Sequence, residues 1–213
     1  MRMLRISTVV ASFMLVGAAV PQVTGSWPTS SKTVNSEGRF WDPAYNNGVP
    51  RSSWAQHLGV DLTATTRDNV LSPVDGFVIY NNTRNSGITQ LKAYIVIKDV
   101  STGWEHVLGH ISSTRPTCSV SLFPTKCPVS TRVYKGQSII GYPMPRNEVG
   151  VHVHWGVNTR SIASAQGYFT GTQWKLASGK QWGWGRAPYE AELAMACSLG
   201  WINPVNYNKC AVN

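Results

Sequence analysis

Three short stretches of the chain contain residues that could bind a metal ion and move protons. His57 and Asp61 lie four positions apart, His110 follows alone, and a single residue separates His152 from His154. A catalytic zinc site needs three protein ligands such as imidazole and carboxylate, and it leaves a fourth position for water. Two histidines and one aspartate meet that need, and the remaining two histidines could handle protons. The competing interpretation of His152 and His154 is a hydrogen-bonded pair on a half-exposed strand, and that stretch alone favours neither.

The histidine pair is expected on a β-strand, because valine alternates with histidine in VHVHWGV (151–157). Successive side chains of a strand point to opposite faces. His152 and His154 should therefore share one face, and Val153 and Trp155 should take the other.

The first motif is also expected on extended chain. Gly59 lies between His57 and Asp61 and disfavours a helix there, and positions four apart on a strand share a face. His110 should end a further strand, directly after Gly109. The imidazole of His57 and the carboxylate of Asp61 can then converge.

The elements that must hold these residues form an antiparallel, mainly β fold. Short β-like runs separated by glycine-containing turns indicate such a core. A single helix is expected near the end, at 188–200, with Pro188 near its start and Gly200 past its end. We therefore predict a small antiparallel β-sheet domain with a metal-binding groove, long loops and a short C-terminal helix. The expected strands are 70–80, which a Pro-Val-Asp-Gly turn at 73–76 interrupts, 91–100, 104–112 and 151–157. Residues 131–142 are expected to form a strand, a Lys-Gly turn and a second strand.

The start of the chain resembles a secretory signal peptide at 1–25. Arg2 and Arg5 form a basic region, and an apolar stretch follows that ends in small residues. Cleavage could follow Ala19 or Gly25, and an uncleaved anchor is the competing interpretation. We expect an exported protein, extracellular or periplasmic, that does not span a membrane after processing.

The 213 residues suffice for one domain with a core. We expect an irregular lead-in at 26–53, a metal-binding core at 54–160 and a C-terminal segment at 161–213. Residues 161–188 have no clear period and are expected to form a long loop. Its tryptophans either line a groove for sugar or peptide or anchor the loop in the core; they are Trp174, Trp182 and Trp184.

Four cysteines in an exported chain predict disulfides. Cys118 and Cys127 bracket one short loop, and Cys197 and Cys210 bracket another, so we expect local pairing. A zinc site made of the four cysteines is disfavoured, because no C-x₂-C spacing occurs.

The formal charge of +9 includes Arg2 and Arg5, and their removal with the signal peptide leaves +7. The basic residues are scattered, so nucleic acid is not an expected partner. The charge favours either an anionic surface, such as a bacterial wall polymer, or simple solubility. We expect a monomer.

Taken together, the motifs resemble those of lysostaphin-type (LytM-like) zinc metallopeptidases. The resemblance runs from about residue 54 to 158, with a fainter likeness near the end. The matching stretches are H-x-G-x-D at 57–61, VLSPVDGFV at 70–78, GHIS at 109–112, KGQSIIG at 135–141, H-x-H at 152–154 and INPVNY at 202–207.

The resemblance implies a zinc-dependent endopeptidase that cleaves peptide bonds in bacterial peptidoglycan. It implies Zn²⁺ held by His57, Asp61 and His154, with His110 and His152 flanking the attacking water. The family's fold is a small, mostly antiparallel β domain. One departure is Gly156, which stands where the family often has glutamate after the aromatic residue, and a second is the inserted loop at 118–127.

Two other polar residues have weaker signals. His106 lies four residues before His110 in the same expected strand and could share its face, and we expect a structural role for it rather than a ligand. Asn81 begins an N-x-T sequon, which matters only if a eukaryote secretes the protein.

Two rival functions remain open. A non-catalytic zinc- or peptidoglycan-binding module, such as an activator of another wall hydrolase, would share the motifs. A basic carbohydrate-binding protein would account for the tryptophans but not for the histidines.

Overall fold

The structure is a computed structural model, and it describes part of the chain in detail. The described residues are 25–36, 38–41, 45–46, 49–50, 56–83, 93–113, 132–145, 150–160, 168–169, 173–175, 181–183, 186–187 and 193–205. Residues 1–24 of the expected signal peptide lie outside them, and so does the inserted loop at 118–127 together with Cys210.

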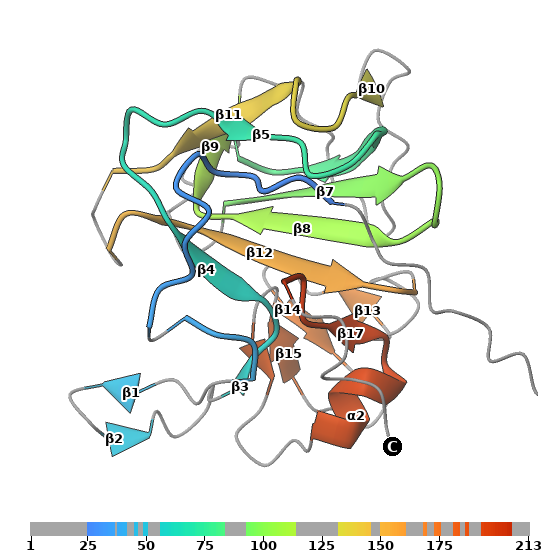
Figure 1. Cartoon of the computed structure of the whole chain (residues 1–213). Coiled ribbons are helices and arrows are strands. Elements are labelled where there is room, and N and C mark those ends of the chain that lie inside the picture. Colours follow the sequence, from blue (N-terminus) through green and yellow to red (C-terminus); the bar gives the residue numbers. More distant parts are fainter. Residues whose placement is uncertain are drawn as a thin grey trace, which may run out of the picture.

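The largest sheet among the described residues has seven strands, and all its pairs are antiparallel (Figure 1). Its path runs β10-β6-β7-β8-β12-β17, and β4 pairs with the first half of β12 on the edge opposite β8. The strands are β4 (Val60–Thr63), β6 (Gly76–Asn81), β7 (Tyr94–Asp99), β8 (Glu105–Gly109), β10 (Arg132–Val133), β12 (His152–Asn158) and β17 (Trp201–Ile202).

A smaller sheet of three strands has the order β5-β11-β9 (Figure 1). Its strands are β5 (Val70–Leu71), β9 (Ile111–Ser113) and β11 (Ile139–Pro143). The turn expected at 73–76 lies between β5 and β6. The strand, Lys-Gly turn and strand expected at 131–142 correspond to β10 and β11, joined by a turn in which Gly136 has a positive φ of 64°.

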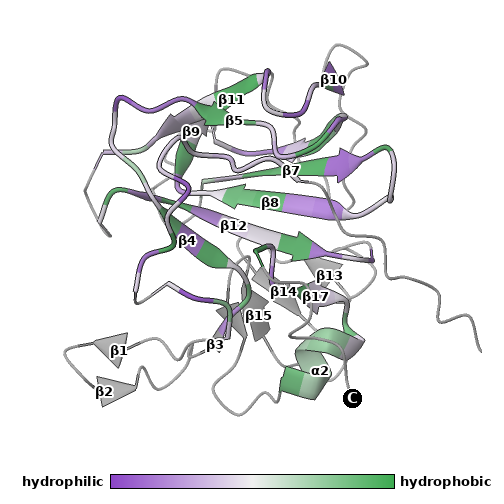
Figure 2. Ribbon diagram, viewed as in Figure 1, coloured by the Kyte–Doolittle hydropathy of each residue, from purple (hydrophilic) through white to green (hydrophobic). Residues whose placement is uncertain are grey.

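The core lies where β7, β8 and β12 run side by side. The apolar parts of β7 and β8 lie next to each other (Figure 2), and Ile95 of β7 and Trp155 of β12 both lie directly opposite Leu108 of β8. Val96, Val107 and Val157 are buried there, and branched side chains suit such a pleated, packed surface. The expected mainly β, antiparallel fold is confirmed.

Residues 26–36 and 38–41 of the lead-in pack on the core without forming a regular strand. Phe40 is buried, and the Trp27 ring lies 6.3 Å from the Trp155 ring. Val34 forms an isolated β-bridge with Leu62, so this segment covers the edge of β4 that β12 leaves open. Its sequence shows no alternation because a single bridge and a few hydrogen bonds, rather than a regular ladder, hold it.

The expected loop at 161–188 also contains strands. Three short strands pair as β13-β14-β15, and β16 pairs with β3 near the start of the chain. Two further strands, β1 and β2, form a separate pair. The bounds are β1 (Tyr45–Asn46), β2 (Val49–Pro50), β3 (Gln56–His57), β13 (Tyr168–Phe169), β14 (Gln173–Lys175), β15 (Gln181–Gly183) and β16 (Arg186–Ala187).

The expected C-terminal helix is present as α2 (Leu193–Ser198), and residues 188–192 of its predicted range lie outside the described residues. Gly200 follows it with a φ of 90° and donates its N–H to the carbonyl of Cys197, as a glycine past a helix end often does. Cys197 takes part in a disulfide. Because the other cysteines lie outside the described residues, the pairing stays a prediction. No helix in the described part of the chain is long and apolar enough to cross a membrane.

Candidate metal centre

Two side chains of the predicted metal-binding set meet across a strand pair. His154 of β12 lies directly opposite Asp61 of β4 and, on the other side, opposite Gly109 of β8. Directly opposed residues share a face of the sheet. His152 shares it too, being two residues from His154, and the nitrogen Nε2 of His152 lies 3.7 Å from Oδ1 of Asp61.

His57 also lies next to Asp61, but the backbone between them differs from the single extended strand that was predicted. It ends β3, and Asp61 lies in β4, so the two residues are not on one continuous strand. The chain bends at Gly59, where a Cβ atom would lie 2.7 Å from Cε1 of His154 and 2.5 Å from the carbonyl oxygen of Trp155. Glycine is therefore required at this bend so that the His154 ring can pack against it.

The three potential ligand atoms form a small triangle. The nitrogen Nε2 of His57 lies 2.9 Å from Nδ1 of His154 and 3.1 Å from Oδ1 of Asp61, and the third side is 3.2 Å. Ligands at ordinary zinc distances in a tetrahedral site lie roughly 3.3–3.6 Å apart. The triangle is thus close to the size that one zinc ion requires, and these residues could hold a metal ion.

The described part of the lead-in contributes directly to this triangle. The Nδ1–H of His57 donates to the backbone carbonyl of Arg39 over 3.1 Å, which leaves the Nε2 lone pair directed toward Asp61. A carbonyl that fixes a ligating histidine in this way is usual in metal sites. Gly38 packs against Asp61, since a Cβ there would lie 2.4 Å from the Cβ of the aspartate. Sequence reasoning could not identify Arg39, because every residue has a carbonyl.

The ionised form of the Asp61 carboxyl group is strongly favoured at this site. Burial alone would raise the pKa of its carboxyl group, but the nearby His57, His154 and His152 side chains hold it well below its usual range. The carboxylate is therefore ionised at neutral pH and available to a cation.

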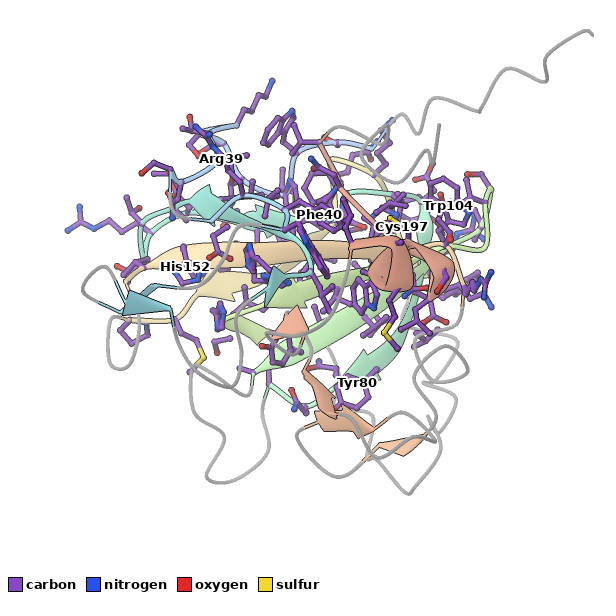
Figure 3. The ribbon with its side chains drawn as sticks, turned by 90° about the horizontal axis from the view of Figure 1, so that it is seen from below. Arg39, Phe40, Tyr80, Trp104, His152 and Cys197 are labelled. Atoms are coloured by element: carbon purple, nitrogen blue, oxygen red, sulfur yellow. The ribbon has the colours of Figure 1, made fainter. Side chains whose placement is uncertain are left out.

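His152 is oriented by its own backbone neighbour. Its Nδ1–H donates to the carbonyl of Gly150 over 2.5 Å, so the neutral ring presents the Nε2 lone pair toward the ligand triangle. In the view from below, His152 lies at one end of the sheet, far from Trp104 and from Cys197 of α2 (Figure 3).

His110 departs from the expected strand geometry. It stands between β8 and β9 with a φ of 62°, which residues other than glycine seldom adopt. In a regular strand it would share the face of His106 and Leu108, away from His154. Instead its ring lies 4.7 Å from the His152 ring and 6.2 Å from the His154 ring, measured between centroids. The left-handed backbone thus turns this imidazole toward the ligand triangle.

His106 does not share the face of His110, contrary to the expectation. It lies opposite Val157 and is fully buried, and its Nδ1 accepts a hydrogen bond from the indole N–H of Trp155 over 3.3 Å. Burial lowers the pKa of His106 to about 4, although the charge of Asp99 acts to raise it. This histidine is part of the core behind the site.

The packing around position 156 leaves no space for a side chain. A Cβ at Gly156 would lie 2.9 Å from the carbonyl oxygen of Leu58 and 3.2 Å from the Trp201 ring. A glutamate, which the family that the motifs resemble often has at this position, would not fit this packing.

Comparison with known proteins adds two solved structures. No protein-family model and no curated protein matches the chain. A zinc-containing peptidase from Vibrio cholerae is 20% identical and superposes with a TM-score of 0.40, over 59% of this chain and 32% of that one. A mutant catalytic domain of the prophage-encoded M23 protein EnpA from Enterococcus faecalis is 23% identical, with a TM-score of 0.37, over 59% of this chain and 84% of that domain.

This chain thus spans about a third of the length of the Vibrio cholerae protein. The first solved structure is a peptidase by its description, and the second is the catalytic domain of an M23 protein, the group that the sequence motifs resemble.

Proposed function

We propose that the protein is an exported zinc-dependent endopeptidase that hydrolyses peptide bonds in bacterial cell-wall peptidoglycan. The observation that carries the proposal is the triangle of His57, Asp61 and His154, with the imidazoles of His110 and His152 next to it. A purely structural metal site would be closed by a fourth protein ligand. Two further histidines beside three ligands suit a site where chemistry takes place.

The ligand residues fit zinc in chemistry as well as in size. Two imidazoles and one carboxylate form a borderline donor set, and the Nδ1–H of His57 is already committed to the Arg39 carbonyl. When bound, zinc supplies Lewis acidity that polarises a carbonyl and makes a water molecule more acidic.

His152 is the proposed general base. Because Gly150 holds its Nδ1–H, the Nε2 atom is the one that can accept a proton from the attacking water. The water must lie within hydrogen-bonding distance of this nitrogen, on the side that faces Asp61.

His110 is the proposed partner on the other side of the scissile bond. Its ring lies edge-on to that of His152, so both can contact one substrate group. An N–H of His110 would stabilise the negative charge that develops on the carbonyl oxygen. The proton that His152 accepts from the water would then pass to the leaving amine as the C–N bond breaks.

The substrate and location are part of the same proposal. The formal charge of +9, or +7 after removal of a signal peptide, suits a protein that works among anionic wall polymers. We propose that it acts as a monomer after export, with peptidoglycan peptides as substrate and without a nucleic-acid partner.

The test is digestion of purified peptidoglycan by the zinc-loaded protein, with and without a chelator, followed by mass spectrometry of the fragments. We expect new amine and carboxylate ends at one kind of peptide bond, loss of cleavage with chelator and its return with added zinc. Zinc-loaded protein that binds the wall but releases no fragments would instead favour a non-catalytic binding module.

A further inference from the structure

The backbone at His110 is held in a conformation that costs free energy. A non-glycine residue with a φ of 62° persists only where its surroundings fix it, and such residues are common at functional sites. Hydrogen bonds hold both backbone groups of His110. Its N–H donates to the carbonyl of Ala93 over 2.9 Å, and its carbonyl accepts from the N–H of Met144 over 2.9 Å.

A second set of hydrogen bonds fixes β7 and β9, the two strands whose residues lie near His110. The triplet Asn81-Asn82-Thr83 begins with the last residue of β6, and all three residues are buried. Asn82 bonds the backbone of Tyr94 at the start of β7, with its side-chain oxygen 2.8 Å from the N–H and its own backbone N–H 3.2 Å from the carbonyl. The Tyr94 ring in turn lies 5.8 Å from the His110 ring.

Thr83 fixes β9. Its hydroxyl donates to the side-chain oxygen of Asn81 over 2.8 Å, so its oxygen lone pairs are left to accept the N–H of Ser113 over 3.1 Å. Ser113 ends β9, three residues after His110. The hydroxyl therefore has both its donor and its acceptor role fixed, and it ties β9 to the end of β6.

Burial excludes the other role that the sequence offered for this triplet, that of a glycosylation site at Asn81. The amide of Asn81 is fully buried and accepts hydrogen bonds from the N–H and the hydroxyl of Thr83. An N-linked glycan cannot be attached to such a side chain in the folded protein.

We propose that Thr83 is a positioning residue for His110. It fixes the end of β9, three residues after His110, so that the chain must leave β8 through the left-handed turn that directs the His110 imidazole toward His152. The proposal rests on the proposed function for its activity readout but not for its structural one.

The test compares Thr83→Val, which keeps the shape but removes the hydroxyl, with Thr83→Ser, which keeps the hydroxyl. Ser72→Ala is the matched control, because Ser72 is also buried and its hydroxyl donates to the carbonyl of Val74 over 2.7 Å, in a bond that does not involve β9. If Thr83→Val does not fold, Thr83→Cys replaces it, since a thiol is a weak acceptor of similar size.

The structural readout is the NMR signal of the His110 imidazole in the zinc-loaded protein. We expect it to shift in Thr83→Val while the signals of His57 and His154 and the zinc content stay unchanged. Thr83→Ser and Ser72→Ala should leave the His110 signal in place. An unshifted signal in folded Thr83→Val would overturn the proposal, whether or not the parent hydrolyses peptidoglycan.

The activity readout follows if the parent is an enzyme. Thr83→Val should lower kcat by about tenfold with little change in KM, as part of the roughly 10²–10⁴-fold that a positioned acid or base contributes. In a His110→Ala background, Thr83→Val should cause no further loss. An equal loss of kcat in both backgrounds would show that Thr83 acts on general stability and not through His110.

Discussion

Two histidines of the site are each fixed by one backbone carbonyl. Arg39 holds His57 and Gly150 holds His152, in both cases through Nδ1–H, and both Nε2 atoms then face Asp61. A neutral imidazole has one donor and one acceptor nitrogen, so these carbonyls decide which nitrogen can bind a metal ion or accept a proton.

Replacing His57, Asp61 or His154 by Ala should each reduce the zinc content of the purified protein. The parent should contain about one zinc per chain, because three protein ligands and water complete the site. Metal analysis after dialysis measures this directly. Stoichiometric zinc in all three variants would show that the ligands lie elsewhere.

His106 should make the fold sensitive to acid. Its pKa is about 4 when folded and about 6.5 in an unfolded chain, so only the unfolded state takes up the proton between these values. Above pH 6.5 His106 is neutral in both the folded and the unfolded state. The free energy of unfolding then falls as the pH drops toward 4, by roughly 3 kcal/mol at most.

This sensitivity is measured by chemical unfolding of the metal-free protein across that pH range. The variant His106→Gln should show a smaller decrease than the parent, while it keeps zinc and measurable hydrolysis. An identical pH dependence in the two proteins would mean that His106 is not the responsible group.

At the scale of elements, the alternation in 151–157 correctly predicted a strand with both histidines on one face, because a regular ladder leaves its period in the sequence. The left-handed turn at His110 could not be predicted in this way. It depends on tertiary hydrogen bonds with Ala93, just before β7, and with Met144, just after β11, rather than on local residue types. For the same reason the sequence did not predict that the described lead-in packs on the core and bonds irregularly to β4.

The bend at Gly59 provides a test at this scale. Gly59→Ala should push the His154 ring and the backbone of Trp155 aside, lower zinc affinity and destabilise the fold by roughly 1–3 kcal/mol. Gly103→Ala is the control, since that glycine has a φ of 73° but open space around it. The control should lose some stability and keep the parent's zinc affinity, as measured by competition with a chelating dye. Equal zinc affinity in the parent and Gly59→Ala would contradict this account of the bend.

At the scale of the whole molecule, the sequence predicted the antiparallel β fold and the meeting of residues far apart in the chain. It did so through motifs whose residues and spacing resemble those of a known family. The strands within 168–187 were not predicted, because they are only two or three residues long and show no extended alternation.

The disulfide pairing belongs to this scale as well. Peptide mapping without reductant should join Cys118 to Cys127 and Cys197 to Cys210, because each pair encloses a short loop. Cys197 lies in α2, far from His152 at the other end of the sheet, so reduction of its disulfide should not release zinc (Figure 3). A bond between the two pairs would refute local pairing.

The central claim is that one face of β12 both holds a metal ion and performs proton transfer. Zinc content and peptidoglycan hydrolysis, measured on the same preparations of the parent and His152→Ala, test it most directly. We predict equal zinc and the same circular dichroism spectrum, with hydrolysis lower by about 10²–10⁴-fold in the variant. A variant that cleaves as fast as the parent, or a zinc-loaded parent that does not cleave, would contradict the claim.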